Sequence, residues 1–104
     1  MAEVFKLAVP PGAIADLNER LGRTRFPDEA PGSAWAYGTD VVWMRGLVDF
    51  WRNEFDWRAQ EARLNAFPQY KARLNEIDLH FPHVEEEGPD PCPLLLSHGF
   101  SRKL

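Results

Sequence analysis

The sequence is poor in cysteine, with Cys92 as the only one among its 104 residues. A single thiol excludes an internal disulfide and agrees with a reducing compartment, so we expect a cytoplasmic protein. Cys92 stands between two prolines, and nothing beside it in the sequence would activate the thiol. We therefore interpret it as an unreactive structural residue.

Basic residues are also scarce, with 12 lysines and arginines against 16 acidic residues and a net charge of −4. Nucleic acids and anionic membranes bind basic surfaces, so we expect neither as a partner. No apolar run approaches the roughly 18 residues that span a bilayer, and no signal-peptide pattern follows Met1.

Known catalytic and ligand-binding motifs are missing as well. The sequence has no P-loop, dinucleotide fingerprint, zinc-binding pattern or Gly-x-Ser-x-Gly elbow. His80 and His83 lie three apart on an expected strand, so their side chains point to opposite faces. Glu85–Glu87 is interpreted as a solvated charge run. We accordingly expect no metal and no cofactor.

Large aromatic residues are abundant, with four Trp and seven Phe, and apolar residues recur at helical spacing in the first 68 residues. A short extended arm at Val4–Val9 is expected before the first helix. Asp56 is expected to cap the third helix and Thr39 the second. The first predicted helix starts near Pro11 and ends at Gly22, the second covers Thr39–Phe55, and the third runs from Trp57 to about Ala66.

The second predicted helix has the broadest apolar surface, a stripe of Met44, Leu47, Val48, Trp51 and Phe55 widened by further apolar residues. Such a helix should be contacted on more than one side, which favours a docking surface. On the third helix we expect the inward residues to be Trp57, Ala62 and Leu64.

Phe26–Gly38 is rich in proline and glycine and is predicted to be an irregular connector. Trp35 and Tyr37 are expected to pin it to the body of the domain. A second interpretation gives these two residues, with Trp43, a role in binding a small molecule.

Beyond Pro68 the apolar period changes to two, which predicts a β-hairpin over residues 69–84 with a tight turn near Asn75. An acidic loop over 85–92 leads into an apolar run, which predicts a strand over 93–97. The turn over 98–104 follows it. The chain is thus expected to be one α+β domain, with about three helices, a hairpin and one further strand.

Several segments resemble, in order, the N-terminal region of microsomal-type epoxide hydrolases, whose core has the α/β-hydrolase fold. The segment with Asp-Trp-Arg-x-Gln-Glu is the most specific of them. The matching segments are Arg23–Asp28, Trp35–Thr39, Leu47–Trp51, Phe55–Asn65, Phe67–Tyr70, Leu79–Val84 and Leu94–Phe100.

The resemblance implies that the last predicted strand begins an α/β-hydrolase sheet. Family members open an epoxide by attack of an aspartate, and a His-activated water then hydrolyses the ester. The family's nucleophile and base lie beyond the His-Gly turn, so no catalytic side chain is expected in this chain. The resemblance carries over one group, the backbone N–H of Phe100 in an oxyanion-hole turn formed with His98 and Gly99. The family usually has proline next, where this chain has Ser101.

We therefore expect a non-catalytic N-terminal domain or truncated fragment of an epoxide hydrolase, inactive by itself. It would pack on the hydrolase core and meet a small epoxide only in the full-length context. Its aromatic residues would pack or shape the entrance to the site; these are Trp35, Tyr37, Trp43, Trp51 and Trp57. The alternative is a free-standing module that pairs with another copy through its unprotected leucine-rich strand, giving a dimer.

Overall fold

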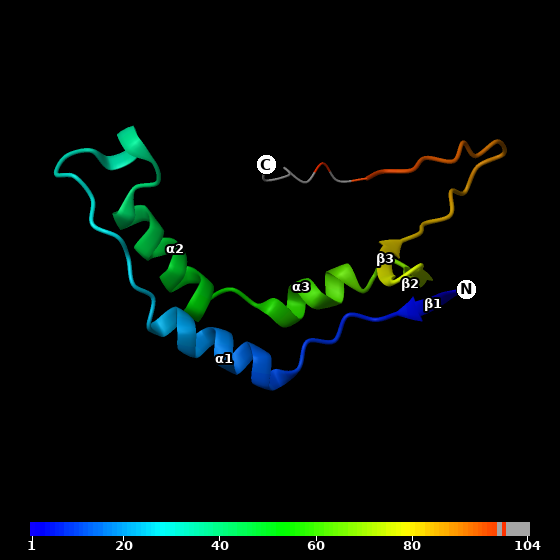
Figure 1. Ribbon diagram of the computed structural model, residues 1–104, viewed down its shortest axis with the longest axis horizontal. Helices are drawn as coiled ribbons and strands as arrows, with labels where there is room; N and C mark the ends of the chain where they lie inside the picture. The colour runs from blue at the N-terminus through cyan, green and yellow to red at the C-terminus, as the bar shows by residue number, and fades with distance from the viewer. Residues whose placement is uncertain (98, 100–104) are drawn as a thin grey trace.

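The computed structural model describes residues 1–97 and Gly99, which form three α-helices, one 3₁₀ turn and one antiparallel sheet (Figure 1). The predicted α+β class and the helix count are confirmed. The elements are β1 (Ala2–Phe5), α1 (Pro11–Gly22), η1 (Ala34–Tyr37), α2 (Val41–Asn53), α3 (Trp57–Leu64), β2 (Gln69–Leu74) and β3 (Ile77–Pro82).

The three strands lie in the order β1-β2-β3, and each pairs antiparallel with its neighbour. Leu74 faces Ile77 across the predicted tight turn, and Asn75 has a positive φ of 56° that asparagine tolerates. The hairpin is therefore confirmed. The N-terminal arm begins earlier than expected, because Ala2–Phe5 finds an open edge on β2 and joins the sheet.

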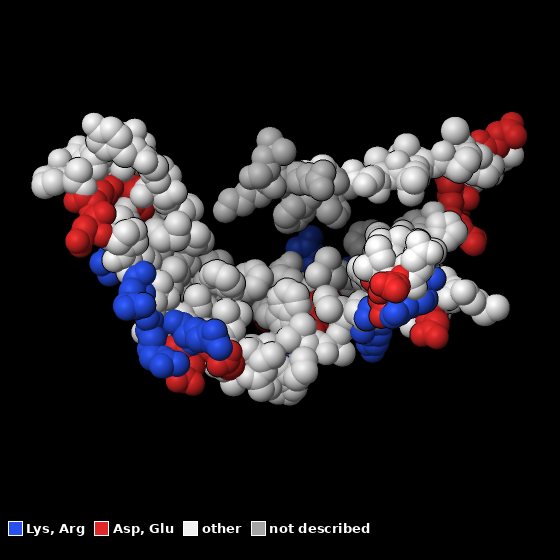
Figure 2. All heavy atoms as spheres, viewed as in Figure 1, with Lys and Arg blue, Asp and Glu red and all other residues white. Residues whose placement is uncertain are grey.

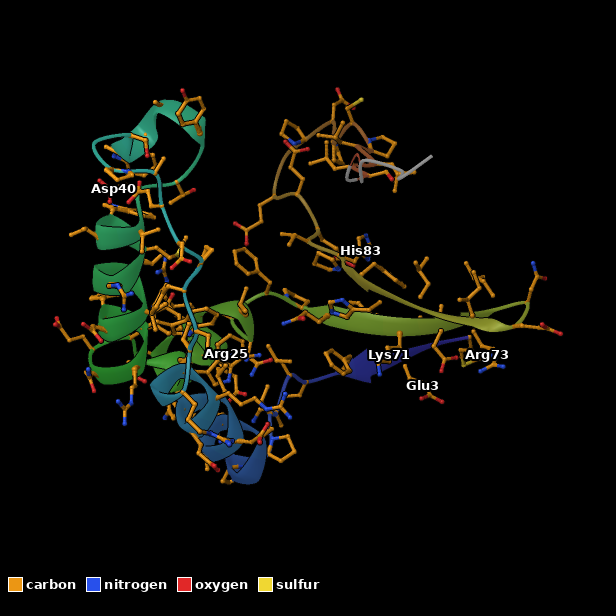
Figure 3. All side chains as sticks on the ribbon, turned by 60° about the vertical axis from the view of Figure 1, so that its left-hand side comes forward. Glu3, Arg25, Asp40, Lys71, Arg73 and His83 are labelled. Carbon is orange, nitrogen blue, oxygen red and sulfur yellow. The ribbon has the colours of Figure 1, made fainter. Side chains whose placement is uncertain are left out.

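Acidic caps fix the starts of α2 and α3, whereas α1 starts at prolines without a side-chain cap. Asp56 caps α3 as predicted, and its carboxylate accepts a hydrogen bond from Ala59 N at 3.1 Å. The predicted Thr39 cap of α2 is wrong. Asp40 has this role, since its Oδ1 accepts from Val42 N at 2.7 Å and Trp43 N at 3.4 Å. Figure 3 shows Asp40 at the start of α2, far from the sheet that carries Lys71.

The connector before α2 is irregular apart from η1. Trp35 packs edge-to-face on Trp43 with ring centroids 5.4 Å apart, so it ties the connector to α2. Tyr37 does not, because 89% of it is exposed. The predicted pinning role is therefore wrong for Tyr37, whereas the contact with Trp43 supports it for Trp35.

Residues 91–97 have no regular secondary structure, so the strand predicted over 93–97 is not formed here. A strand exists only when its N–H and C=O groups pair with a neighbour, and the described part of the chain gives these residues none. Leu94, Leu95 and Leu96 are 80–92% exposed as a result.

The described residues include no buried apolar side chain; the only buried polar one is Gln69, which is hydrogen-bonded to Leu64 O and His80 Nε2. The radius of gyration is 19.8 Å, against about 13 Å for a compact domain of this length. Figure 1 shows the cause, an open arc of helices with the sheet at one end. None of the described helices is long and apolar enough to cross a bilayer.

Candidate functional site

An apolar groove lies between α1, α2 and the start of α3, and we call it the helical groove. Its volume is about 610 Å³, and its walls are almost wholly apolar. Its lining consists of Val9, Ala13, Ile14, Leu17, Leu47, Phe50, Trp51, Phe55 and Trp57.

The groove forms because two amphipathic helices meet along their apolar faces. Ile14 and Leu17 lie on one face of α1 at i, i+3, and Leu47 and Trp51 lie on one face of α2 at i, i+4. These faces cover each other only in part. Leu47 and Phe50 stay 39% and 48% exposed, so the groove presents hydrophobic surface to any partner.

The end of α1 is fitted closely to α2. A Cβ on Gly22 would lie 2.9 Å from Cζ of Arg52, so the absent side chain gives the guanidinium room. The C-terminal end of α1 therefore lies directly against the Arg52 side chain of α2.

Polar side chains at and just after α3 hydrogen-bond to the backbone of the arm that follows β1. Asn65 binds both backbone groups of Leu7: its Oδ1 accepts from Leu7 N at 2.8 Å, and its Nδ2 donates to Leu7 O at 2.7 Å. Glu61 Oε2 accepts from Val9 N at 2.8 Å, and Arg58 Nη1 donates to Val9 O at 2.8 Å. We call Arg58, Glu61 and Asn65 the arm latch.

The spacing of the latch matches the two backbones. Residues four apart on a helix rise about 6 Å, and residues two apart on an extended chain advance about 6.6 Å. Glu61 and Asn65 can therefore meet Val9 and Leu7 in register. The helix replaces a neighbouring strand and satisfies backbone groups that would otherwise be unpaired.

The charge of Glu61 is favoured by its surroundings. The hydrogen bond from Val9 N lowers the pKa of Glu61 below its ordinary value, and the nearby Arg58, 2.9 Å away, lowers it further. Partial burial opposes both effects. Trp57 Nε1 also donates to Glu61 at 3.3 Å, so the latch and a wall of the groove share this carboxylate.

Acid is expected to open the latch at Val9. A carboxylate whose folded pKa lies below the unfolded value of 4.5 stabilises the fold above pH 4.5, and the contribution is lost as the pH falls through the folded pKa. Amide-exchange protection of Val9 should therefore fall below pH 4.5. Glu61→Gln keeps an oxygen acceptor but cannot titrate, so its protection of Val9 should not change with pH; an unchanged acid midpoint in this variant would contradict the assignment.

The five predicted aromatic residues separate into two groups. Trp51 and Trp57 line the helical groove. Trp35 and Trp43 pair at the far end of α2, and with the exposed Tyr37 and Val42 they form what we call the aromatic tip. Both the groove and the tip are apolar surfaces to which α2 contributes, the groove with α1 and α3 and the tip with η1.

The oxyanion-type turn is only partly described. His98 and Phe100 lie outside the described residues, so the role carried over to Phe100 stays a prediction. Cys92 is exposed. His80 stacks edge-on with Phe5, while His83 lies against Tyr70. Within the described chain no three His, Cys, Asp or Glu side chains gather as a metal site would require.

Of the three inward residues predicted on α3, Trp57 is half-buried and lines the groove, whereas the prediction is wrong for Ala62 and Leu64. Leu64 is 45% exposed and Ala62 is also exposed, while Glu61 and Asn65 turn toward the arm. The residues of α3 that contact the arm could be recognised in the sequence only as a polar pattern. Arg58, Glu61 and Asn65 follow helical spacing at i, i+3, i+7 within the most specific matching segment. A polar stripe at this spacing is usually a solvent-facing side of a helix, so only the structure shows that this one contacts the arm backbone.

Comparison of sequences places the chain among known proteins. Residues 2–104 match the family described as "Epoxide hydrolase N terminus". The chain is 42% identical over 96 residues to a protein of Stigmatella aurantiaca named as a candidate epoxide hydrolase, and 34% identical over 100 residues to epoxide hydrolase 1 of Oryctolagus cuniculus. Each match covers 92% of this chain and 22% of the relative, so the chain spans about a fifth of their length.

Solved structures agree with the fold. The epoxide hydrolase of Aspergillus niger superposes with a TM-score of 0.72 at 28% identity, covering 79% of this chain and 22% of that one. The juvenile hormone epoxide hydrolase of Bombyx mori gives a TM-score of 0.77 at 20% identity, covering 86% of this chain and 24% of that one. The same arrangement of helices and sheet is therefore found as one part, about a fifth to a quarter, of these two larger proteins.

Proposed function

Because the chain belongs to the epoxide hydrolase N-terminal family, we propose that it is a non-catalytic domain that packs on an α/β-hydrolase core. The observation that carries this proposal is the surface the domain leaves uncovered. Its accessible surface is 9821 Å², against about 6,000 Å² for a compact monomer of this mass. The excess of roughly 3,800 Å² on this one chain is ample for an interface, since a standard one takes about 800 Å² from each partner.

The arm latch supports a scaffold role. It orders the arm between β1 and α1 by hydrogen bonds rather than by a hydrophobic core, so the apolar faces remain available. A domain that folds in this way keeps its shape while its hydrophobic surface is used for contact with another domain.

The aromatic tip is the part that we propose shapes the entrance to the site of the docked core. Trp35 and Trp43 already hold each other edge-to-face, so little side-chain freedom is lost when a partner covers them. The single, exposed Cys92 supports a reducing, cytoplasmic location for the docked protein.

The chain by itself is expected to hydrolyse no epoxide, because the helical groove offers no nucleophile, acid or base to a bound substrate. The test combines two measurements with styrene oxide. The purified chain should give no diol above background, whereas a chimera that carries this chain in place of the matching segment of the Stigmatella aurantiaca relative should be active. Turnover by the chain alone, or an inactive but folded chimera, would count against the proposal.

A further inference from the structure

The carboxylate of Glu61 holds two residues whose side chains line the helical groove. Its Oε2 accepts hydrogen bonds from Val9 N at 2.8 Å and from Trp57 Nε1 at 3.3 Å. The side chains of both Val9 and Trp57 line the groove. Val9 belongs to the arm and Trp57 begins α3, so one oxygen atom joins two wall residues that are far apart in the sequence.

This carboxylate is itself held in place. Arg58 Nη1 donates to Glu61 Oε1 at 2.9 Å and to Oε2 at 3.2 Å, and it also donates to Val9 O at 2.8 Å. The arm faces the carboxylate with backbone groups. The side chain of Glu61 is 12% exposed, so water competes little for these bonds. Figure 2 shows charged atoms gathered on the outer side of the helices and over the hairpin, with mostly uncharged surface inside the arc.

The arm presents alternate residues to α3. Leu7 and Val9 are half-buried, whereas Lys6 and Ala8 are exposed, as expected for an extended segment with one covered face. Asn65 binds the backbone of Leu7, and Glu61 binds Val9 two residues further along the arm. A displacement of the arm at Leu7 therefore also displaces the donor that shares Glu61 Oε2 with the indole of Trp57.

We propose that Glu61 couples the arm to the helical groove, so that the arm and the Trp57 wall move as one unit and release of the arm changes the shape of the groove. Among the described residues, Glu61 is the hydrogen-bond partner of the Trp57 indole. An indole without this bond is free to turn over the apolar residues beside it, which the hydrophobic effect favours. The intact contact thus keeps the groove open. This inference concerns the free chain and does not depend on the proposed docking to a hydrolase core.

Hydrogen exchange of the Trp57 indole N–H, followed by NMR, tests the coupling. The resonance is identified by its loss in Trp57→Phe. Asn65→Leu disturbs the arm at Leu7, about two helical turns beyond Trp57, and should accelerate exchange of the indole at least about threefold. Gln60→Leu is the control, because Gln60 accepts only from Arg63 of its own helix, and exchange should stay unchanged. Loss of protection at Leu7 with unchanged indole exchange would overturn the coupling.

Removing the carboxylate separates coupling from a general loosening of the fold. Glu61→Leu should accelerate exchange of Val9 N–H at least about tenfold, the loss expected for a hydrogen bond to a charged group. In this background Asn65→Leu should have no further effect on the Trp57 indole. Asn65→Ala replaces Asn65→Leu if circular dichroism shows that the latter loses helix. An equal effect on the indole with and without Glu61 would contradict the proposal.

Methyl resonances report the shape of the groove. Ile14 and Leu17 line it together with Trp57, so a turn of the indole ring should shift their methyl signals in Glu61→Leu. Glu61→Gln keeps an oxygen acceptor and should leave them close to those of the unaltered chain. The methyl signals of Leu79, which lies in the hairpin, should stay the same in both variants. Unshifted groove methyl signals in a folded Glu61→Leu variant would show that the walls are held independently of Glu61, which would also overturn the proposal.

Discussion

Replacing Asn65 by leucine is expected to lower the free energy of unfolding by about 2–3 kcal/mol. Leucine has nearly the shape of asparagine but neither donates nor accepts, so Leu7 N and Leu7 O lose the partners they have at 2.8 Å and 2.7 Å. Both backbone groups belong to a half-buried residue, so each costs an amount at the low end of the about 1–3 kcal/mol that a buried unpaired group costs. No apolar side chain is buried among the residues that the structure describes, so little else there offsets such a loss.

Amide exchange of Leu7 and urea unfolding followed by circular dichroism give the measurement. Gln60→Leu is the control, because it makes the same change on the same helix where the amide accepts only from Arg63 of that helix. Protection of Leu7 should fall in the first variant and persist in the second. Equal protection in both would show that the latch does not hold the arm.

Replacing Trp43 by alanine is expected to weaken docking to a hydrolase core about 30- to 1,000-fold, the loss typical of a tryptophan anchor at an interface. Trp43 is 51% exposed and held by Trp35, so it is an ordered apolar surface that a partner can cover. Its removal should spare the helix, because the Asp40 cap binds the backbone of this residue and not its ring.

The measurement is calorimetric titration of the chain into the Stigmatella aurantiaca relative produced without its matching segment. Ile77→Ala is the control, since Ile77 is also exposed but lies in the hairpin at the opposite end of the domain. Both variants should keep their helix content. Unchanged affinity for Trp43→Ala would exclude the aromatic tip from the docking interface.

The sequence predicted local structure well because local signals are short-range. The Pro11 start and Gly22 end of α1 and the Asp56 cap of α3 each depend on a few neighbouring residues. The turn at Asn75 could be predicted for the same reason, because asparagine tolerates the positive φ that the turn requires. The shift of the α2 cap from Thr39 to Asp40 is an error of one residue, within the ambiguity of two adjacent capping residues.

The functional surfaces were predicted only in part. Leu47 and Trp51 were identified as one apolar stripe, but the sequence does not say that α1 lies beside it or that the groove stays open. The strand expected at 93–97 depended on neighbours that periodicity cannot supply. On α3 the inward position of Trp57 was predicted correctly, but Ala62 and Leu64 were not, because apolar spacing gives no sign of the hydrogen bonds by which Glu61 and Asn65 contact the arm.

The sequence alone determined the helices, the hairpin and the membership of an epoxide hydrolase N-terminal family, since each follows from residue order along the chain. Tertiary structure decided which faces are covered. The pairing of Asn65 with Leu7, 58 residues away, joins segments that no local pattern relates. It also decided that the apolar faces remain open, because burial depends on what lies across a surface in space and not on what lies beside it in sequence.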